Sequence, residues 1–210
     1  MRRHRGRADR LTLWLIGMVS VCPLLLVVSC SDAARSSDGD EPADVLLVGL
    51  DDADEVATWT TVNDPVMGGA STSRIRFGDG GLVFSGNISL DNNGGFASAR
   101  SPQDPDIGRR AAGATSLGVR AVGDGKTYLL KVGRPEQPWS YVQRFPTEAG
   151  VDRIYQLPVE DFQPVGTRLG PAPDAPKNLD PATIGQVSIY ILDKQQGPFE
   201  IRASAITATF

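Results

Sequence analysis

Two short segments rich in glycine, asparagine and aspartate hold the residues best suited to chemistry. The first spans residues 59–71 and places Asp64 near a Gly-Gly pair; the second spans residues 85–100, contains another Gly-Gly pair and ends at Arg100. Two carboxylates, such as Asp64 with Asp193, could serve as acid and base in glycoside hydrolysis. Oxygen ligands of this kind could also hold a hard cation such as calcium. We interpret both aspartates as structural and keep these two chemistries as alternatives.

The first 29 residues have the pattern of a secretion signal. Five arginines lie within the first ten residues, and an apolar run follows from Leu11 to Val28. The run ends in Val-Val-Ser-Cys at Cys30, which resembles the cleavage box of a bacterial lipoprotein. We expect cleavage before Cys30 and lipid on its sulfur, which would hold the protein on the bacterial cell membrane, outside the cytoplasm. An uncleaved anchor is the alternative, because about 20 apolar residues can span a bilayer.

Cleavage at this point would limit the chemistry of the mature chain. The only histidine, His4, and one of the two cysteines, Cys22, would be lost, and lipid would block Cys30. Catalysis by Ser-His-Asp or Cys-His pairs and zinc binding through His or Cys are then excluded. The net charge would fall from −4 to about −8, because five arginines and one aspartate leave, so nucleic acid is not an expected partner. We expect no catalytic residue, no metal and no cofactor.

The rest of the chain is typical of a small all-β domain. Residues 30–44 are polar and acidic and predict a flexible tether, and residues 45–210 predict one domain. The chain has 23 glycines and 15 prolines, which suit many short strands joined by turns. A strand-turn-strand unit over residues 74–85 brings the two glycine-rich segments close to one another.

The spelling of these two segments resembles the complex I intermediate-associated protein 30 family. The shared pattern is a Trp, then Asn-Asp-x-Val-Met-Gly-Gly-x-Ser, then Asn-Asn-Gly-Gly-Phe-x-Ser-x-Arg. At the two x positions of the first segment the chain has Pro65 and Ala70, where the family usually has other residues. Further matches lie at Phe145, in residues 157–162 and 179–184, and in residues 193–199. The resemblance implies a jelly-roll β-sandwich similar to galactose-binding domains. It also implies a role like that of the mitochondrial members, which act in the assembly of respiratory complex I.

The resemblance supplies most of the candidate binding residues, and Tyr141 and Arg144 are added to them as part of a possible ligand face. The candidates are Trp59, Asn63, Asp64, Met67, Gly68, Gly69, Ser71, Asn92, Asn93, Gly94, Gly95, Phe96, Arg100, Tyr141, Arg144, Asp193 and Lys194.

Three functions fit these residues. The first is a non-catalytic binding or assembly module whose partner is an envelope or membrane protein. The second is a carbohydrate-binding module whose ligand face contains Tyr128, Trp139, Tyr141 and Arg144. Core packing is the alternative for the two tyrosines of that face, and also for Trp59, which often fills the interior of a sandwich. The third is a carboxylate-based hydrolase.

Several structural expectations follow from the pattern of the chain. Residues 51–56 predict either one helical turn or an acidic loop, and residues 101–114 predict an exposed loop. Residues 117–122 and 128–132 predict a hairpin. Residues 162–181 predict a long proline-containing loop. Residues 186–192 predict a central strand, because they are the most apolar run of the domain.

One specific contact is also expected between the two glycine-rich segments. An arginine fork can bond a carboxylate at two points, so Arg100 is predicted to pair with Asp64 or to cap carbonyls of the turn that follows Asp64.

Overall fold

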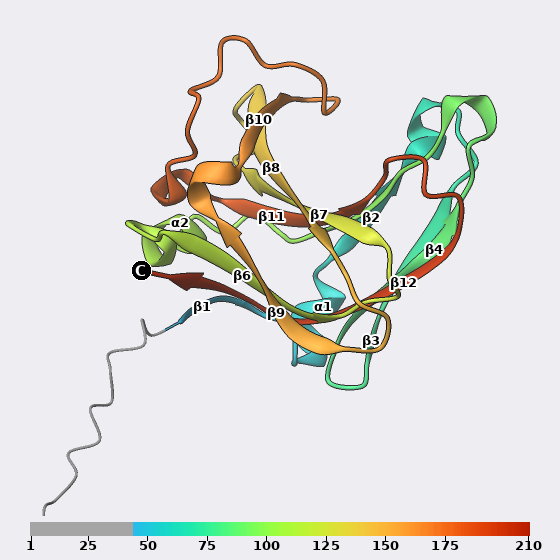
Figure 1. Ribbon diagram of the computed structural model, residues 1–210, viewed down its shortest axis with the longest axis horizontal. Helices are drawn as coiled ribbons and strands as arrows, with labels where there is room; N and C mark the ends of the chain where they lie inside the picture. The colour runs from blue at the N-terminus through green and yellow to red at the C-terminus, as the bar shows by residue number, and fades with distance from the viewer. Residues whose placement is uncertain (1–43) are drawn as a thin grey trace, which may run out of the picture. The chain divides into compact units, whose positions relative to one another are not determined.

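Strands that alternate between apolar and polar side chains form two antiparallel sheets, which pack face to face as a β-sandwich (Figure 1). The computed structural model describes residues 44–210, apart from the side chains of residues 66 and 67. The predicted signal sequence, Cys30 and nearly all of the predicted tether lie outside this range. The prediction of an all-β fold is confirmed. Among residues 44–210, no helix is long and apolar enough to cross a membrane.

The longest strand, β12, organises the first sheet, which we call sheet A. Its residues Phe199, Ile201 and Ala203 face the core, and a bulge after Ala203 shifts the alternation so that Ile206 faces it next. The strands in spatial order are β3 (Thr72–Gly78), β4 (Gly81–Ile88), β12 (Gly197–Thr209), β6 (Ser116–Val122) and β9 (Asp152–Pro158), and β1 (Val45–Gly49) also pairs with β12.

The second sheet, sheet B, carries the candidate site. Its strands in spatial order are β10 (Gln163–Gly166), β8 (Trp139–Pro146), β7 (Thr127–Gly133), β11 (Gln186–Ile191), β5 (Ala97–Arg100) and β2 (Thr60–Asn63). The predicted central strand is confirmed, because β11 lies between β7 and β5. Val187 and Ile189 of this strand are buried in the main core, so Ser188 and Tyr190 point to the opposite, outer face of sheet B.

Apolar side chains lie on both faces of sheet B. The main core fills the space between the sheets, where Ala97 and Ala99 of β5 are buried completely. A smaller cluster of Leu129, Val142 and Tyr190 lies on the outer face, with Phe96 packed against it. The outer face therefore combines a local apolar base with the polar residues that alternate along the same strands.

The helices are short and sit at the ends of strands. In α1 (Ala53–Ala57), Val56 is buried and the Asp52 carboxylate accepts a hydrogen bond from the Asp54 N–H at 2.7 Å, so the helical alternative for this segment is correct. The 3-10 turns are η1 (Asp64–Met67), η2 (Asp91–Asn93), η3 (Val159–Asp161) and η4 (Pro181–Thr183).

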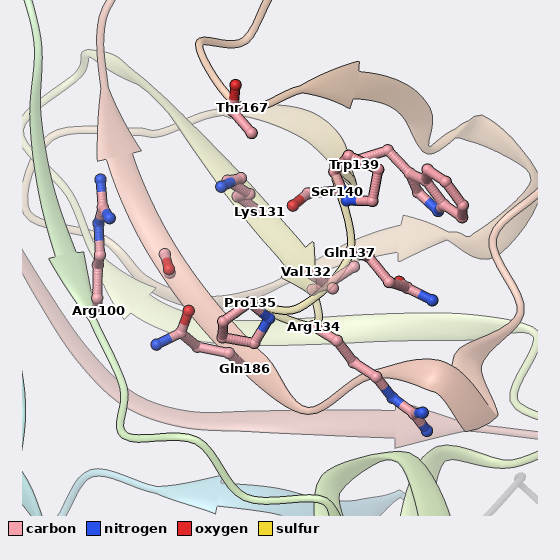
Figure 2. A pocket seen from close by; sticks show the side chains of 13 residues that line it. Arg100, Lys131, Val132, Arg134, Pro135, Gln137, Trp139, Ser140, Thr167 and Gln186 are labelled. Atoms are coloured by element: carbon pink, nitrogen blue, oxygen red, sulfur yellow. The ribbon is translucent and has the colours of Figure 1, made fainter. Parts of the chain in front are cut away.

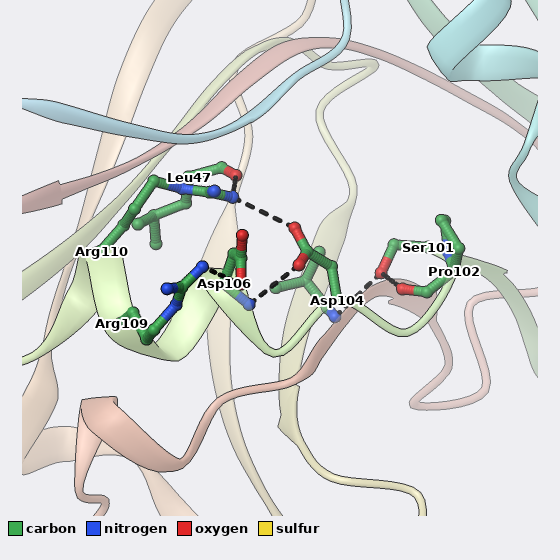
Figure 3. Close-up of polar contacts among 8 residues, drawn as sticks. Leu47, Ser101, Pro102, Asp104, Asp106, Arg109 and Arg110 are labelled. Atoms are coloured by element: carbon green, nitrogen blue, oxygen red, sulfur yellow. Dashed lines mark hydrogen bonds and ion pairs between the residues drawn. The ribbon is translucent and has the colours of Figure 1, made fainter.

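The predicted exposed loop over residues 101–114 is wrong, because it contains the helix α2 (Asp106–Ala111). Ile107 and Ala111, one turn apart, are buried in the core. Figure 3 shows how polar contacts fix the helix: the Arg110 guanidinium donates to the Leu47 carbonyl at 2.7 Å, and the Asp104 carboxylate accepts from the Asp106 N–H. The prolines and the two consecutive arginines of this segment indicated a loop, but the apolar residues Ile107 and Ala111 are enough to bury one face of a helix.

The predicted hairpin of residues 117–122 and 128–132 is also wrong, although both strands exist. β6 belongs to sheet A and β7 to sheet B, so the turn between them crosses from one layer to the other. Leu117 and Val119 of β6 and Leu130 of β7 are buried in the same core cluster. The two strands therefore face one another across the core instead of pairing side by side.

The long loop predicted over residues 162–181 is only partly correct. Its first residues form the edge strand β10, which pairs with β8. Pro164 is tolerated there because an edge strand leaves one row of backbone groups unpaired. After β10 the chain turns back on itself, with the Gly166 N–H donating to the Gly170 carbonyl at 2.9 Å. In Figure 1 the remaining segment forms a wide loop beyond β10 before it reaches η4.

Candidate functional site

The two glycine-rich segments meet around the carboxylate of Asp64, which is only 1% exposed. One oxygen, Oδ1, accepts from the Ser71 N–H at 2.8 Å. The other, Oδ2, accepts from the Ser71 hydroxyl at 2.5 Å, the Gly95 N–H at 2.6 Å and the Phe96 N–H at 3.2 Å. We call Asp64, Ser71, Gly95 and Phe96 the Asp64 cluster. It ties η1 to the start of β5, more than thirty residues along the chain.

The glycine pairs make this approach possible. A Cβ atom on Gly69 would lie 2.4 Å from the Asp64 Cγ, and one on Gly94 would lie 2.7 Å from Asp64 Oδ2. Gly95 has φ +130°, a conformation that other residues rarely adopt, and this directs its N–H at the carboxylate. Close packing around the buried Asp64 side chain therefore explains why each segment contains a Gly-Gly pair.

Opposing effects act on the protonation of Asp64. Burial raises the pKa of its carboxyl, whereas hydrogen bonds from Gly95, Ser71 and Phe96 lower it. The hydrogen bonds prevail, so the pKa of Asp64 lies below its ordinary value of 3.8. The carboxylate is therefore charged at neutral pH, and its charge is satisfied by donors from within the protein.

The predicted contact between Asp64 and Arg100 is wrong. The Arg100 Nε donates to the Ser98 hydroxyl at 3.1 Å, and its guanidinium lies 5.5 Å from the centre of the Tyr190 ring. Asp64 bonds instead to the residues just before β5, while Arg100 is the last residue of that strand. Four residues of extended chain span roughly 13 Å, which separates the two groups.

The other motif residues are distributed between the core and the loops. Trp59 is 5% exposed and packs in the main core, as the core alternative expected. Asn63 contacts the Ser73 hydroxyl, while Asn92 and Asn93 are exposed in η2 with positive φ. Gly68 has φ +90° at the end of η1, and Met67 belongs to η1, its side chain lying outside the described atoms.

The proposed ligand face of Tyr128, Trp139, Tyr141 and Arg144 does not form. Tyr128 and Tyr141 are 0% and 3% exposed and pack between the sheets, as their core alternative expected. Their strands place them on the inner face of sheet B, whereas Arg144 is accessible on β8. Arg144 instead forms a two-point ion pair with Asp193, at 2.7 and 2.8 Å.

Among the candidates whose side chains the structure describes, Arg144 and Asp193 are the one distant pair outside the Asp64 cluster that bond through their side chains. The bond from Arg144 lowers the pKa of Asp193. Both side chains are about half exposed, and Lys194 beside them is exposed with φ +58°. We regard this pair as a clamp between β8 and the turn after β11.

A cleft on the outer face of sheet B is the best candidate site (Figure 2). Ser188 of β11 lies directly opposite Arg100 of β5 on one side and Lys131 of β7 on the other, so all three point outward in one row. The loop between β7 and β8 and the turn after β10 complete the walls. The main polar and aromatic lining residues are Arg100, Lys131, Arg134, Gln137, Trp139, Ser140, Thr167, Gln186 and Ser188.

The charge of this cleft is uniformly positive. Arg100, Lys131 and Arg134 line it, and no lining residue is acidic. Within residues 44–210, neither Arg100 nor Lys131 forms an ion pair. Both lie against Tyr190, with the Lys131 Nζ 5.8 Å from the ring centre. Burial, together with the nearby charge of Arg100, lowers the pKa of Lys131.

Sequence reasoning named Arg100 and Trp139 but missed the other residues that line the cleft. A signal was present, since the polar positions Gln186 and Ser188 interrupt the most apolar strand at every second residue. Lys131 interrupts the apolar strand β7 in the same way. Polar residues at alternate positions of a central strand indicate an outer face that is open to a ligand. No group of three or more His, Cys, Asp or Glu side chains suited to a metal occurs among residues 44–210.

Comparison with known proteins identifies the family. The model of the complex I intermediate-associated protein 30 family matches residues 48–203. The chain belongs to this family. A search of curated proteins found no significant match.

Two solved structures of carbohydrate-binding modules share the sandwich fold. One is the family 11 module of the cellulosomal cellulase Lic26A-Cel5E of Clostridium thermocellum, with a TM-score of 0.56 at 13% identity, covering 80% of this chain and 95% of that one. The other is the family 11 module of the same organism in complex with a β-1,3-1,4-mixed-linked tetrasaccharide. Its TM-score is 0.53 at 14% identity, and it covers 77% of this chain and 94% of the other. The jelly-roll sandwich predicted from the sequence is confirmed.

Proposed function

We propose that this family member is a non-catalytic binding module that holds a saccharide chain in the cleft on the outer face of sheet B. The cleft is the observation that carries the proposal: hydroxyl and amide side chains of Ser188, Gln186, Ser140 and Thr167 line it, and Trp139, which also packs partly against the main core, lines it as well. Hydroxyl and amide groups can bond the hydroxyls of a sugar, and an indole offers an apolar face for its ring.

The size and surroundings of the cleft favour a linear ligand. Its volume of about 200 Å³ is below the roughly 300–1,000 Å³ of pockets that enclose a whole small molecule. A second cleft, beneath the turn and loop of residues 166–175, shares Trp139 and Thr167 with it. A chain could place one unit beside Arg100 and continue across Trp139. A structural relative was solved with a tetrasaccharide, which supports this class of ligand.

The state of Asp64 supports a non-catalytic role. Both of its oxygens accept hydrogen bonds from within the protein, so this carboxylate has no free oxygen to offer a substrate. Asp193, the other aspartate considered for hydrolysis, is paired with Arg144. Because both aspartates are bonded within the protein, their state supports a binding function over hydrolysis.

A protein partner is the second candidate. Membership in the complex I intermediate-associated protein 30 family favours it, since the family name describes association with an intermediate of a protein complex. In this form of the proposal, the module would bind an envelope or membrane protein. Pull-down from detergent-solubilised membranes, followed by identification of the captured proteins, tests this candidate.

Membrane attachment through Cys30 is part of the proposal. The lipoprotein box before Cys30 supports it, and two or more acyl chains would hold the domain firmly at a membrane. The test is metabolic labelling of wild type and Cys30→Ser with a palmitate analogue. Label should enter the wild type and be absent from Cys30→Ser. Equal labelling of both would overturn the anchor while leaving the binding function untouched.

The saccharide proposal is tested by a polysaccharide-binding screen with the full chain in an uncharged detergent. We expect retention by at least one polysaccharide and a loss of roughly tenfold or more in affinity for Gln186→Ala, which removes a polar group from the cleft. Because the Gln186 amide also donates to the Ser101 carbonyl at 2.8 Å, a thermal melt of the variant must show that the fold is intact. The matched control is Gln156→Ala, an exposed glutamine on the edge strand of sheet A. Absence of binding to every polysaccharide, with a membrane protein captured instead, would replace this function by the second candidate.

A further inference from the structure

The cleft on the outer face of sheet B contains positive charge that the protein itself does not neutralise. Arg100 and Lys131 point into it from β5 and β7, on either side of Ser188. Three cations line the cleft without a single carboxylate, although the chain as a whole has more acidic than basic residues. Figure 2 shows Arg100 and Lys131 on the strands that form the cleft.

Holding these charges in the cleft destabilises the protonated form of Lys131 in the unliganded protein. Lys131 is partly buried against Tyr190, and Arg100 approaches the same ring from β5, the strand on the other side of β11. Burial and the like charge of Arg100 both act against the protonated form of Lys131, which is why its pKa is lowered. The attraction of an anion placed between the two side chains would offset both penalties.

We propose that the cleft selects an acidic saccharide, whose anionic group binds between Arg100 and Lys131 above Ser188. This inference rests on the proposed saccharide-binding function and adds the chemistry of the ligand to it. The anionic group is a carboxylate, as in a uronic acid, or a sulfate or phosphate ester. The arginine fork bonds such a group at two points, the lysine adds a point charge, and the Ser188 hydroxyl supplies a further donor.

The spacing of the strands suits one anionic group. Arg100 and Lys131 lie two strand spacings apart, which is roughly 9–10 Å at the backbone. The Arg100 Cζ lies 5.5 Å and the Lys131 Nζ 5.8 Å from the centre of the Tyr190 ring, so both charged ends reach the surroundings of one side chain.

Arg134 is less suited, because it lies in the loop after β7 and not in the row of Arg100, Ser188 and Lys131. The Nε of each arginine is already bonded within the protein, to the Ser98 hydroxyl for Arg100 and to the Thr183 carbonyl for Arg134, so the anion would meet the terminal nitrogens of Arg100.

The experiment compares acidic and neutral polymers by affinity electrophoresis of the full chain in uncharged detergent. The polymers are polygalacturonate and alginate for carboxylate, dextran sulfate for sulfate ester, a phosphomannan for phosphate ester, and mixed-linkage β-glucan as the neutral arm. Poly-glutamate is included as an acidic peptide. The variants are Lys131→Met, which keeps the apolar stem, and Arg100→Gln. The control is Arg74→Gln, which removes an exposed charge from sheet A.

We expect retardation by one acidic class, weakened roughly tenfold or more in Lys131→Met and in Arg100→Gln, and unchanged in Arg74→Gln. The class that retards the protein identifies the anionic group.

Binding to the neutral glucan that both variants retain would overturn the acidic preference and leave the proposed function in place. Failure with every polysaccharide would overturn both, and retardation by poly-glutamate alone would assign the cleft to an acidic protein. Equal weakening by Arg74→Gln would mean non-specific attraction and would also overturn the inference. Thermal melts of each variant separate these outcomes from loss of the fold.

Discussion

The Asp64 cluster and the sheet B cleft both hold charge away from water, but they treat it in opposite ways. The Asp64 carboxylate has four donors from three residues around it, and its lowered pKa reflects that satisfaction. Lys131 and Arg100 have no carboxylate partner among the described residues, and the pKa of Lys131 is lowered because its charge is penalised. A charged group whose hydrogen-bond partners all come from the protein indicates a role in folding. A charged group in a cleft without an oppositely charged partner indicates a place for a ligand.

The comparison also explains why the most recognisable sequence is not the best candidate site. The long Asn-Asp and Gly-Gly motifs identify the family, yet their central residues pack around Asp64. The cleft is built from isolated residues on four different strands. A change in the first region should therefore affect stability, and a change in the second should affect binding.

The largest expected effect is the loss of stability in Asp64→Ala. Removing the carboxylate leaves the N–H groups of Ser71, Gly95 and Phe96 without their acceptor, at a total cost on the order of 3–5 kcal/mol. A domain of this size would melt roughly 10 °C or more lower. Arg100→Ala should change stability by less than about 1 kcal/mol, and the double variant should show the sum. If the stability losses of the two single variants do not add up to that of the double variant in thermal melts, Asp64 and Arg100 are in contact after all, which would contradict the structure.

Overpacking the same cluster should produce the next largest effect. In Gly69→Ala the new methyl group would meet the Asp64 side chain, and we expect a loss of about 1–3 kcal/mol in urea unfolding. Gly170→Ala is the matched control, because a Cβ there has nothing within 4 Å and its φ is not positive. If Gly69→Ala is as stable as this control, the Gly-Gly pair has a role other than close packing.

Acid should reveal the satisfied charge of Asp64. Because its folded pKa lies below the ordinary value of 3.8, the carboxylate contributes its full stability above that value. The contribution is lost as pH falls through the lower, folded pKa. The stability difference between wild type and Asp64→Asn should therefore be constant from pH 7 to about pH 5 and shrink below about pH 4. A difference that grows on acidification would mean that the folded pKa is raised instead.

The smallest expected effect belongs to the ion pair of Arg144 and Asp193. Both side chains are about half exposed, so Arg144→Gln should cost only about 0.2–1 kcal/mol despite the two-point geometry. Added salt at about 1 M should remove most of that difference, because it screens exposed charges. A loss comparable to that of Asp64→Ala would show that this pair is a structural centre as well.

Alternation and turn residues act locally, so they predicted most of the strands, and the resemblance to the family predicted the sandwich. The sequence predicted the central position of β11 from its apolar content, and it anticipated the close approach of the two glycine-rich segments. It failed where the answer depended on which layer a strand joins, as with β6 and β7. The burial of one face of α2 was missed for a similar reason, since six residues carry too short a periodic pattern.

The site was predictable only in part. Asp64 and Arg100 were both singled out, but their types suggested that they pair with one another. The actual partners of Asp64 are backbone N–H groups and the Ser71 hydroxyl, and those of Arg100 are the Ser98 hydroxyl and the Tyr190 ring. Neither set of partners is visible in a sequence. The cleft depends on the register that aligns Arg100, Ser188 and Lys131 across three strands, which no local pattern specifies.

The most direct test of the contrast is to map a bound acidic oligosaccharide by amide chemical shifts. The isotope-labelled chain is titrated with a galacturonate oligomer and, separately, with a neutral β-glucan oligomer. We predict that the acidic oligomer shifts the amides of Arg100, Lys131 and Ser188 and leaves those of Ser71, Gly95 and Phe96 in place. The neutral oligomer should cause smaller shifts at the same cleft. Shifts centred on the Asp64 cluster, with the cleft unaffected, would contradict the account.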